Sequence, residues 1–95
     1  MMTPEMQPLY RPESYPQSVK DALGAMPPLA TEIANRWMMG WPKRVKALLQ
    51  ADQFLPLLTE QEEAERRAYS NPGNKHLARH EIAEMYGLSN EAPML

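Results

Sequence analysis

The sequence has no cysteine and no long apolar run. Without cysteine, disulfides and thiolate metal clusters are excluded. The longest stretch free of charged residues is residues 22–31, which holds two prolines, whereas a membrane-spanning helix needs about 20 apolar residues. The first residues also lack the basic start and the apolar stretch of a secretory signal. We therefore expect a soluble protein located in the cytoplasm, with no membrane contact.

Charge of one sign is not in excess either. The net charge is −2 and the isoelectric point is about 5.6, while dedicated nucleic-acid-binding domains often exceed about 9. Nucleic acid is therefore a disfavoured partner. The charges are nevertheless uneven, because residues 36–46 carry four basic side chains and no acidic one, and residues 52–65 carry five acidic side chains and no basic one. This distribution can orient a protein partner or pair two copies of the chain.

The residue patterns of common catalytic sites are also missing. The four glycines are isolated at positions 24, 40, 73 and 87, so the chain has neither a Gly-rich phosphate loop nor a nucleophile elbow. The carboxylates of residues 60–65 are expected on a solvated helix face rather than in a cleft suited to acid–base catalysis. We expect no enzymatic activity and no cofactor, and a metal-dependent enzyme is the remote alternative.

Strand-forming patterns are scarce, because β-branched residues are few and no run alternates apolar and polar residues. Apolar residues instead recur with a period near 3.6 from residue 14 onward. Proline and glycine divide this pattern into five helical segments. The predicted helices start at a Ser14–Gln17 capping box, at Pro28, at Pro42, at Pro56 or Thr59, and at Asn74, and the last one ends at Gly87.

The sequence thus predicts an all-α fold, a compact array of four to five short helices over residues 14–88 with a frayed tail at 89–95. The second half of the fourth helix offers little more than alanines, so we expect it to bury little. Large apolar residues on the inner helix faces form the predicted core. They are Leu23, Ile33, Trp37, Trp41, Val45, Leu48, Leu49, Leu58, Leu77 and Ile82.

Prolines recur at every fourth position near the start of the chain, at positions 4, 8, 12 and 16. Each proline fixes φ and removes a backbone donor, so residues 1–13 are predicted to form an extended Pro-rich arm. Leu9, Tyr10 and Tyr15 are its candidate anchors for a partner. The alternative is a mobile tail that lies partly on the domain.

Two histidines and an acid, His76, His80 and Glu84, follow one another at a spacing of four. On one helix they share a face, as ligands of a metal ion must. That face lies opposite the apolar arc of the same segment. We therefore expect these side chains to face water, and we predict no metal site.

Residues 82–89, Ile-Ala-Glu-Met-Tyr-Gly-Leu-Ser, resemble the first helix and turn of the helix-turn-helix family of DNA-binding proteins. Ala83, Gly87 and Leu88 match the small residue, the turn glycine and the following apolar residue of that family. The resemblance implies a second, base-reading helix, yet only residues 90–95 follow, and they include a proline. The resemblance accounts for a turn and does not support DNA readout.

These observations favour a small non-enzymatic interaction module, an adaptor or accessory protein that binds a protein partner or a second copy of itself. The alternative is a nucleic-acid-associated regulator that uses the basic patch at 36–46 or the partial helix-turn-helix at 82–89. Aromatic residues, methionine and arginine are enriched at protein interfaces, so the arm and the basic patch supply the predicted partner-binding residues. These residues are Leu9, Tyr10, Tyr15, Arg36, Met38, Met39, Lys43 and Arg44.

Overall fold

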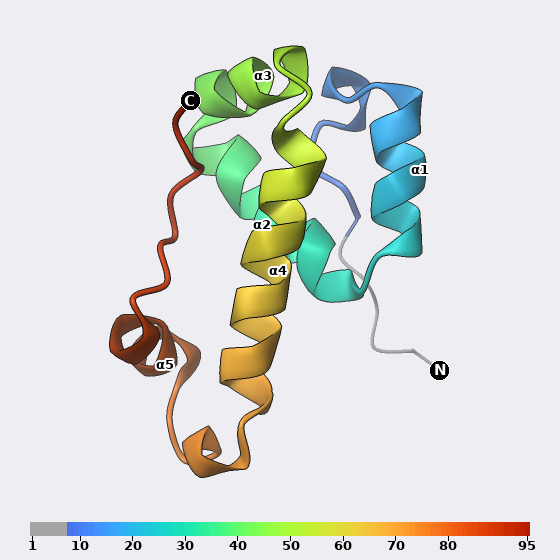
Figure 1. The fold of residues 1–95 in the computed structure, drawn as a ribbon. Helices are drawn as coiled ribbons and strands as arrows, with labels where there is room; N and C mark the ends of the chain where they lie inside the picture. The colour runs from blue at the N-terminus through green and yellow to red at the C-terminus, as the bar shows by residue number, and fades with distance from the viewer. Residues whose placement is uncertain (1–7) are drawn as a thin grey trace.

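The computed structural model describes residues 8–95, so residues 1–7 of the predicted arm lie outside the described residues. No strand occurs in the described part of the chain, which confirms the predicted all-α fold (Figure 1). The helices are η1 (Pro12–Ser14), α1 (Gln17–Ala25), α2 (Pro28–Gly40), α3 (Pro42–Gln50), α4 (Phe54–Ser70), η2 (Pro72–Asn74) and α5 (Arg79–Tyr86), where η marks a single 3-10 turn.

Proline and glycine set most of the helix boundaries. Pro28 and Pro42 are the first residues of α2 and α3, where a backbone N–H would have no acceptor within the helix. Pro56 lies within the first turn of α4, which begins two residues earlier than predicted. Gly87 ends α5 in the left-handed region at φ +68°, and Leu88 N donates to Ala83 O at 2.8 Å. This is the helix end that glycine favours.

Two predicted helix starts are wrong. Ser14 belongs to η1 and caps nothing, because the chain turns at Tyr15 and α1 starts only after Pro16. The last helix begins at Arg79 instead of Asn74. The Asn74 side chain does not cap a helix, because it donates to Ala68 O at 2.9 Å and to the Tyr86 hydroxyl at 3.0 Å.

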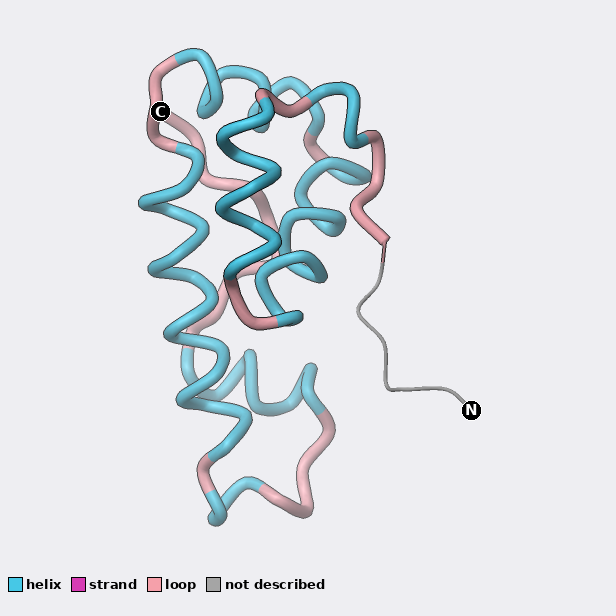
Figure 2. Tube along the Cα trace, turned by 90° about the vertical axis from the view of Figure 1, so that its right-hand side faces the viewer, coloured by secondary structure: helices cyan, strands magenta, loops and turns pink. Residues whose placement is uncertain are grey.

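The long helix α4 packs against α2, α3 and α5. In Figure 1, α1 and residues 8–15 lie on one side of the α2–α4 pair, and α5 lies beside the far end of α4. Short loops join the helices, as the turned view in Figure 2 shows. None of the helices within residues 8–95 combines the length and the apolar character that crossing a bilayer requires.

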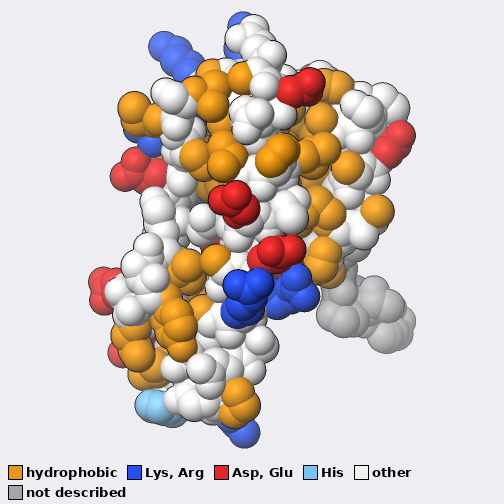
Figure 3. Space-filling model, viewed as in Figure 1, with side chains coloured by type: hydrophobic (Ala, Val, Ile, Leu, Met, Phe, Trp, Pro, Cys, Tyr) orange, Lys and Arg blue, Asp and Glu red, His pale blue; other side chains and the backbone are white. Residues whose placement is uncertain are grey.

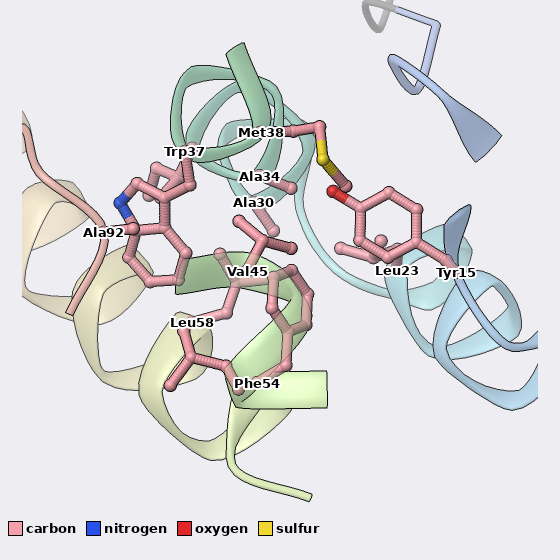
Figure 4. Packing of buried hydrophobic residues seen from close by; sticks show 12 residues of the cluster. Tyr15, Leu23, Ala30, Ala34, Trp37, Met38, Val45, Phe54, Leu58 and Ala92 are labelled. Atoms are coloured by element: carbon pink, nitrogen blue, oxygen red, sulfur yellow. The ribbon is translucent and has the colours of Figure 1, made fainter. Parts of the chain in front are cut away.

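The apolar core joins α1, α2, α3 and the first half of α4 (Figure 4). The Phe54 ring meets the Trp37 ring edge-on at a centroid distance of 6.0 Å. The Tyr15 ring is tilted against the same Phe54 ring at a centroid distance of 5.5 Å. Such aromatic pairs add to the burial of apolar area. Most of the predicted core is buried, namely Leu23, Ile33, Trp37, Val45, Leu48, Leu58 and Ile82.

The other three predicted core residues, Trp41, Leu49 and Leu77, are only partly buried. Two aromatic residues that the prediction left out of the core, Tyr15 and Phe54, are buried instead. Both precede or open a helix, so helical periodicity gives no information about where they point. Tyr15 reaches the core because η1 turns the arm back toward α1.

The second half of α4 differs from the prediction of a solvated face. Glu62 and Glu65 are each 2% exposed, and Ala68 is buried as well. These residues continue the inward stripe of Phe54 and Leu58 at spacings of three and four. The helix is long enough for α5 and the end of the chain to pack against this half.

The chain after α5 runs back along the molecule toward α3 (Figure 1). Residues 89–95 are predicted to fray, but Ala92 is 1% exposed and belongs to the apolar core cluster. The reason is that side chains of α2, α3 and α4 hold the backbone of this segment, as described below. The domain boundaries at residues 13 and 88 stay predictions.

Candidate functional site

The arm is attached to α2 through one side chain amide. Asn35 lies buried on α2; its Nδ2 donates to Pro8 O at 3.0 Å, and its Oδ1 accepts from Tyr10 N at 2.8 Å. The amide thus pairs with the arm backbone as a neighbouring strand would. Leu9, between these two contacts, packs against the apolar core. Residues 8–10 therefore lie in a fixed position beside the end of α2.

Arg11 turns the chain from this contact into η1. Its φ is +54°, in the left-handed region, which costs a residue with a Cβ roughly 1–2 kcal/mol. The guanidinium carbon lies 5.4 Å from the Tyr10 ring centroid, within range of a cation–π interaction. Strained non-glycine residues of this kind cluster at functional sites.

A groove of about 420 Å³ lies between η1, the end of α2 and α3. Its apolar part comes from Met38, Pro42 and Leu49, and its charged part from three cations. Within the described residues, no carboxylate forms an ion pair with any of these cations. We call this hollow the basic groove; it is lined by Arg11, Ser14, Met38, Pro42, Lys43, Lys46 and Leu49.

Two shallower hollows adjoin the basic groove. One, of about 450 Å³, shares Arg11 with it and lies between the arm and Met39, which is 64% exposed. The other, of about 300 Å³, shares Lys43 with it and surrounds the turn at Trp41. The three hollows form one continuous region, here called the corner surface. Figure 3 shows basic side chains at the top of the molecule, where α3 lies in Figure 1.

The structure brings part of the predicted binding residues together at the corner surface. Leu9, Tyr10 and Met39 line the hollow beside the arm, and Lys43 and Arg44 line the hollow at the α2–α3 turn. The two surfaces predicted from the sequence, one on the arm and one on the basic patch, are therefore neighbours.

Of the other three predicted binding residues, Tyr15 and Arg36 lie outside the corner surface, and Met38 lines it although it is largely buried. Tyr15 is buried in the core, and Met38 is buried except where it reaches the floor of the basic groove. Arg36 points away from the corner toward α4, where it pairs with Glu65. Burial of Tyr15 raises the pKa of its hydroxyl to about 12, because no acceptor within the described residues compensates the lost water.

The predicted binding residues do not include two of the three groove cations, Arg11 and Lys46, although Lys46 belongs to the basic patch at 36–46. Lys46 follows Lys43 by three residues, a spacing that places both on one face of a helix, so its position was accessible from the sequence. The position of Arg11 could not be predicted from the sequence, because it depends on the Asn35 contact and on a left-handed backbone conformation.

A second polar cluster lies at the far half of α4, around the buried carboxylate of Glu65. Arg36 Nη2 lies 2.7 Å from Glu65 Oε2, Gln61 Nε2 donates to the same oxygen at 2.7 Å, and the Tyr69 hydroxyl donates to Oε1 at 3.3 Å. Burial, and then the charge of Glu65 and the hydrogen bond to it, raise the pKa of Tyr69. Arg79 covers the Tyr69 ring at 4.9 Å.

The Arg79 guanidinium also pairs with Glu32 at 3.0 Å. A pocket of about 230 Å³ lies here, and its two arginines are matched by two glutamates. The charges satisfy one another, so the pocket offers no net attraction for a charged ligand. We interpret this cluster as a structural connection between α2, α4 and α5.

The predicted histidine spacing does not occur on one helix. His76 precedes α5, which starts at Arg79, so it does not share a helix face with His80 and Glu84. Among the described residues, no group of three or more His, Asp or Glu side chains is arranged to hold a metal ion. The helix and turn of the partial helix-turn-helix are present in α5 and Gly87, but residues 88–95 form no helix.

The sequence matches no protein-family model, and neither the comparison with curated proteins nor that with solved structures finds a significant relative.

Proposed function

We propose that this protein is a small non-enzymatic interaction module that binds an acidic, partly apolar segment of a protein partner at the corner surface. The observation that carries the proposal is the basic groove, where Arg11, Lys43 and Lys46 surround an apolar floor and form no ion pair with a carboxylate of residues 8–95. Cations of this kind steer an oppositely charged partner and select it. The cytoplasmic location also stays a prediction.

The apolar floor favours a polypeptide over a nucleic acid. Met38 and Leu49 can contact aliphatic side chains, whereas a phosphate backbone needs only the charges. Binding of single-stranded nucleic acid relies on exposed aromatic rings for stacking. Trp37 is fully buried, and Trp41 is partly buried and does not line the basic groove. The nucleic-acid regulator therefore remains the second candidate.

Exposed apolar residues support the same conclusion. Tyr10 and Met39 stand out from the hollow beside the arm, and apolar patches with a polar rim mark protein interaction sites. The Asn35 contact holds the arm in place, so this part of the surface is ordered before a partner arrives. Preorganisation of this kind lowers the entropic cost of binding.

The test is an NMR titration of the isotope-labelled full chain with a peptide of alternating Glu and Leu residues. We expect amide shifts around Arg11, Lys43 and Lys46, and affinity that falls as salt is added. The double variant Lys43→Glu/Lys46→Glu should bind at least about ten-fold more weakly, since each reversal replaces an attraction with a repulsion.

The matched control is Arg67→Glu/Lys75→Glu, which changes the charge equally at two exposed positions away from the corner surface. It should bind the peptide as the unmodified chain does, and circular dichroism should show both variants folded. Equal weakening by both double variants would refute the site. Tighter binding of a DNA oligonucleotide than of the peptide at equal salt would instead support the nucleic-acid regulator.

A further inference from the structure

The chain after α5 lies against side chains of α2, α3 and α4, and the surface that they form beneath residues 88–95 is here called the tail groove. Residues 88–95 form no helix or strand, and beyond Leu88 they form no backbone–backbone hydrogen bond with the rest of the described chain. Side chains hold them instead. Gln61 Nε2 donates to Ser89 O at 3.2 Å, Arg36 Nε donates to Asn90 O at 3.2 Å, and Arg44 Nη1 donates to Ala92 O at 3.0 Å.

Two of these three donors are oriented by the buried carboxylate of Glu65. Arg36 donates to Glu65 from both terminal nitrogens, from Nη2 to Oε2 at 2.7 Å and from Nη1 to Oε1 at 3.5 Å. Its Nε donates to the segment. Gln61 likewise donates to Glu65 and to the segment from one nitrogen. The Glu65 carboxylate thus positions both donors beside the segment. Donors fixed in this way read main-chain carbonyls of any extended chain, whatever its side chains.

Side-chain recognition is confined to two neighbouring positions. Glu91 pairs with Arg44 at 2.9 Å, and Ala92 inserts its methyl group into the core cluster beside Trp37. The groove therefore selects an acid followed by a small residue.

One buried donor in this groove has no acceptor. Trp37 is 0% exposed, and its indole Nε1 forms no hydrogen bond with any of residues 8–95. Figure 4 shows the nitrogen edge of this ring turned toward the chain at Ala92. Buried indole N–H groups usually find a partner, and an unsatisfied buried donor opposes the packing that buries it. The segment thus covers the Trp37 ring but provides no hydrogen-bond acceptor for its Nε1.

We propose that the tail groove between α2, α3 and α4 is a binding site for an extended segment of a partner protein that carries an acid followed by serine, and that residues 88–95 are its weaker internal occupant. The partner's serine takes the place of Ala92 and accepts a hydrogen bond from Trp37 Nε1. The acid takes the place of Glu91 against Arg44. This inference goes beyond the proposed function, because it concerns a different partner segment and other contacts, although Arg44 borders both sites.

The test uses the full chain in a Trp41→Phe background, so that the only indole N–H signal belongs to Trp37. The change Ala92→Asp serves to expel the internal segment, because it places a charge in the core. Two peptides are then added, one with the sequence of residues 88–95 and one with Ala92→Ser in that sequence. We expect the serine peptide to bind at least about five-fold more tightly and to move the Trp37 indole proton downfield.

Equal affinity of the two peptides, or no binding of either, would overturn the proposal. If Ala92→Asp prevents folding, the single change Ala92→Ser in the full chain provides a second measurement. It should slow hydrogen exchange of the Trp37 indole N–H, while the same change at exposed Ala51 should leave it unaltered. An unchanged indole in Ala92→Ser would refute the proposed hydrogen bond.

Discussion

The two ends of α4 bury the same helix face by different chemistry. At the apolar end, Phe54 and Leu58 pack among the aromatic and aliphatic residues of α2 and α3. At the polar end, Glu62 and Glu65 occupy the equivalent inward positions and are as deeply buried. Burial alone therefore does not distinguish the two ends. They differ in how the polar atoms that accompany burial are satisfied.

Within residues 8–95, the apolar end leaves two buried polar groups without hydrogen bonds, whereas at the polar end Glu65 is fully hydrogen-bonded and Glu62 Oε2 is only ion-paired. The Tyr15 hydroxyl and the Trp37 indole N–H are buried without an acceptor in the described chain. Glu65 instead receives hydrogen bonds from Arg36, Gln61 and Tyr69. A buried ion pair recovers little more than its own desolvation cost, so we expect the apolar end to supply most of the stability. The polar end instead orients the side chains of Arg36 and Gln61.

The ion pair at Glu62 differs from that at Glu65. Arg66, one turn further along α4, places Nε 3.0 Å from Glu62 Oε2, and its Nη2 donates to Oε1 at 3.4 Å. The shorter contact is a charge interaction without hydrogen-bond alignment. Glu62 is thus served by one mostly exposed side chain of its own helix, whereas Glu65 joins two helices.

The strongest test of the comparison is Trp37→Ala at the apolar end. Loss of a fully buried indole removes its transfer free energy and leaves a cavity, which costs roughly 3–5 kcal/mol. Urea unfolding of the full chain measures this change. Trp41→Ala, at a partly buried position, is the matched control and should cost distinctly less. A loss below about 1 kcal/mol for Trp37→Ala would mean that the apolar end is not the stable half.

At the polar end, Glu65→Ala should lower the free energy of unfolding by about 2–3 kcal/mol, because charged and polar donors lose their shared acceptor. Arg36 is partly exposed and can turn to water, which keeps the loss below that of Trp37→Ala. The control Glu60→Ala removes an exposed carboxylate of the same helix and should change stability by less than about 0.5 kcal/mol. Equal effects would show that Glu65 makes no net contribution through its partners.

Alkaline pH should weaken the apolar end through Tyr15. Burial raises the pKa of this hydroxyl from 10.0 to about 12, so the folded chain favours the neutral phenol. The resulting stability is fully present below pH 10 and is lost as the pH rises through about 12. Each pKa unit is worth about 1.4 kcal/mol, so the loss is on the order of 2–3 kcal/mol.

Thermal unfolding as a function of pH measures this loss in the unmodified chain and in Tyr15→Phe, which lacks the titrating group. The phenylalanine variant should lose less stability between pH 9 and pH 12. At neutral pH it should be no less stable, since the hydroxyl has no hydrogen-bond partner within the described part of the chain. Tyr10→Phe, at an exposed ring, is the control. Identical pH profiles for all three proteins would contradict the burial of the Tyr15 hydroxyl.

The smallest expected effects come from two glycines outside α4. Gly24 lies in α1, and Gly87 follows α5. Gly87→Ala forces a side chain into a backbone with φ +68° and should destabilise α5 by about 1 kcal/mol. Gly24→Ala, in α1 with open space around it, should stabilise the chain by roughly 0.5–1 kcal/mol. Hydrogen exchange of the α5 and α1 amides measures both changes. Effects of the same sign would refute the backbone argument.

Local features of the sequence determined the helices and most of the core. Pro28, Pro42 and Gly87 set helix ends because their backbone restrictions act within one turn. The 3.6-residue period predicted the inward positions of Ile33 and Val45, since a helix face is fixed by spacing alone. The same reasoning found Lys43 and Met39 at the corner surface, because both lie on or beside predicted helices.

The tertiary structure alone decided the rest, because the contacts involved join positions far apart in the chain. The buried Glu65 is paired by Arg36, which lies 29 positions earlier on α2. Tyr10 is held by Asn35, 25 positions later, and Arg44 fixes Ala92 across 48 positions. The 3.6-residue period of apolar residues describes one helix at a time. It does not show which charged side chains of different helices form contacts. The polar end of α4, the attachment of the arm and the tail groove of residues 88–95 therefore lay beyond the sequence.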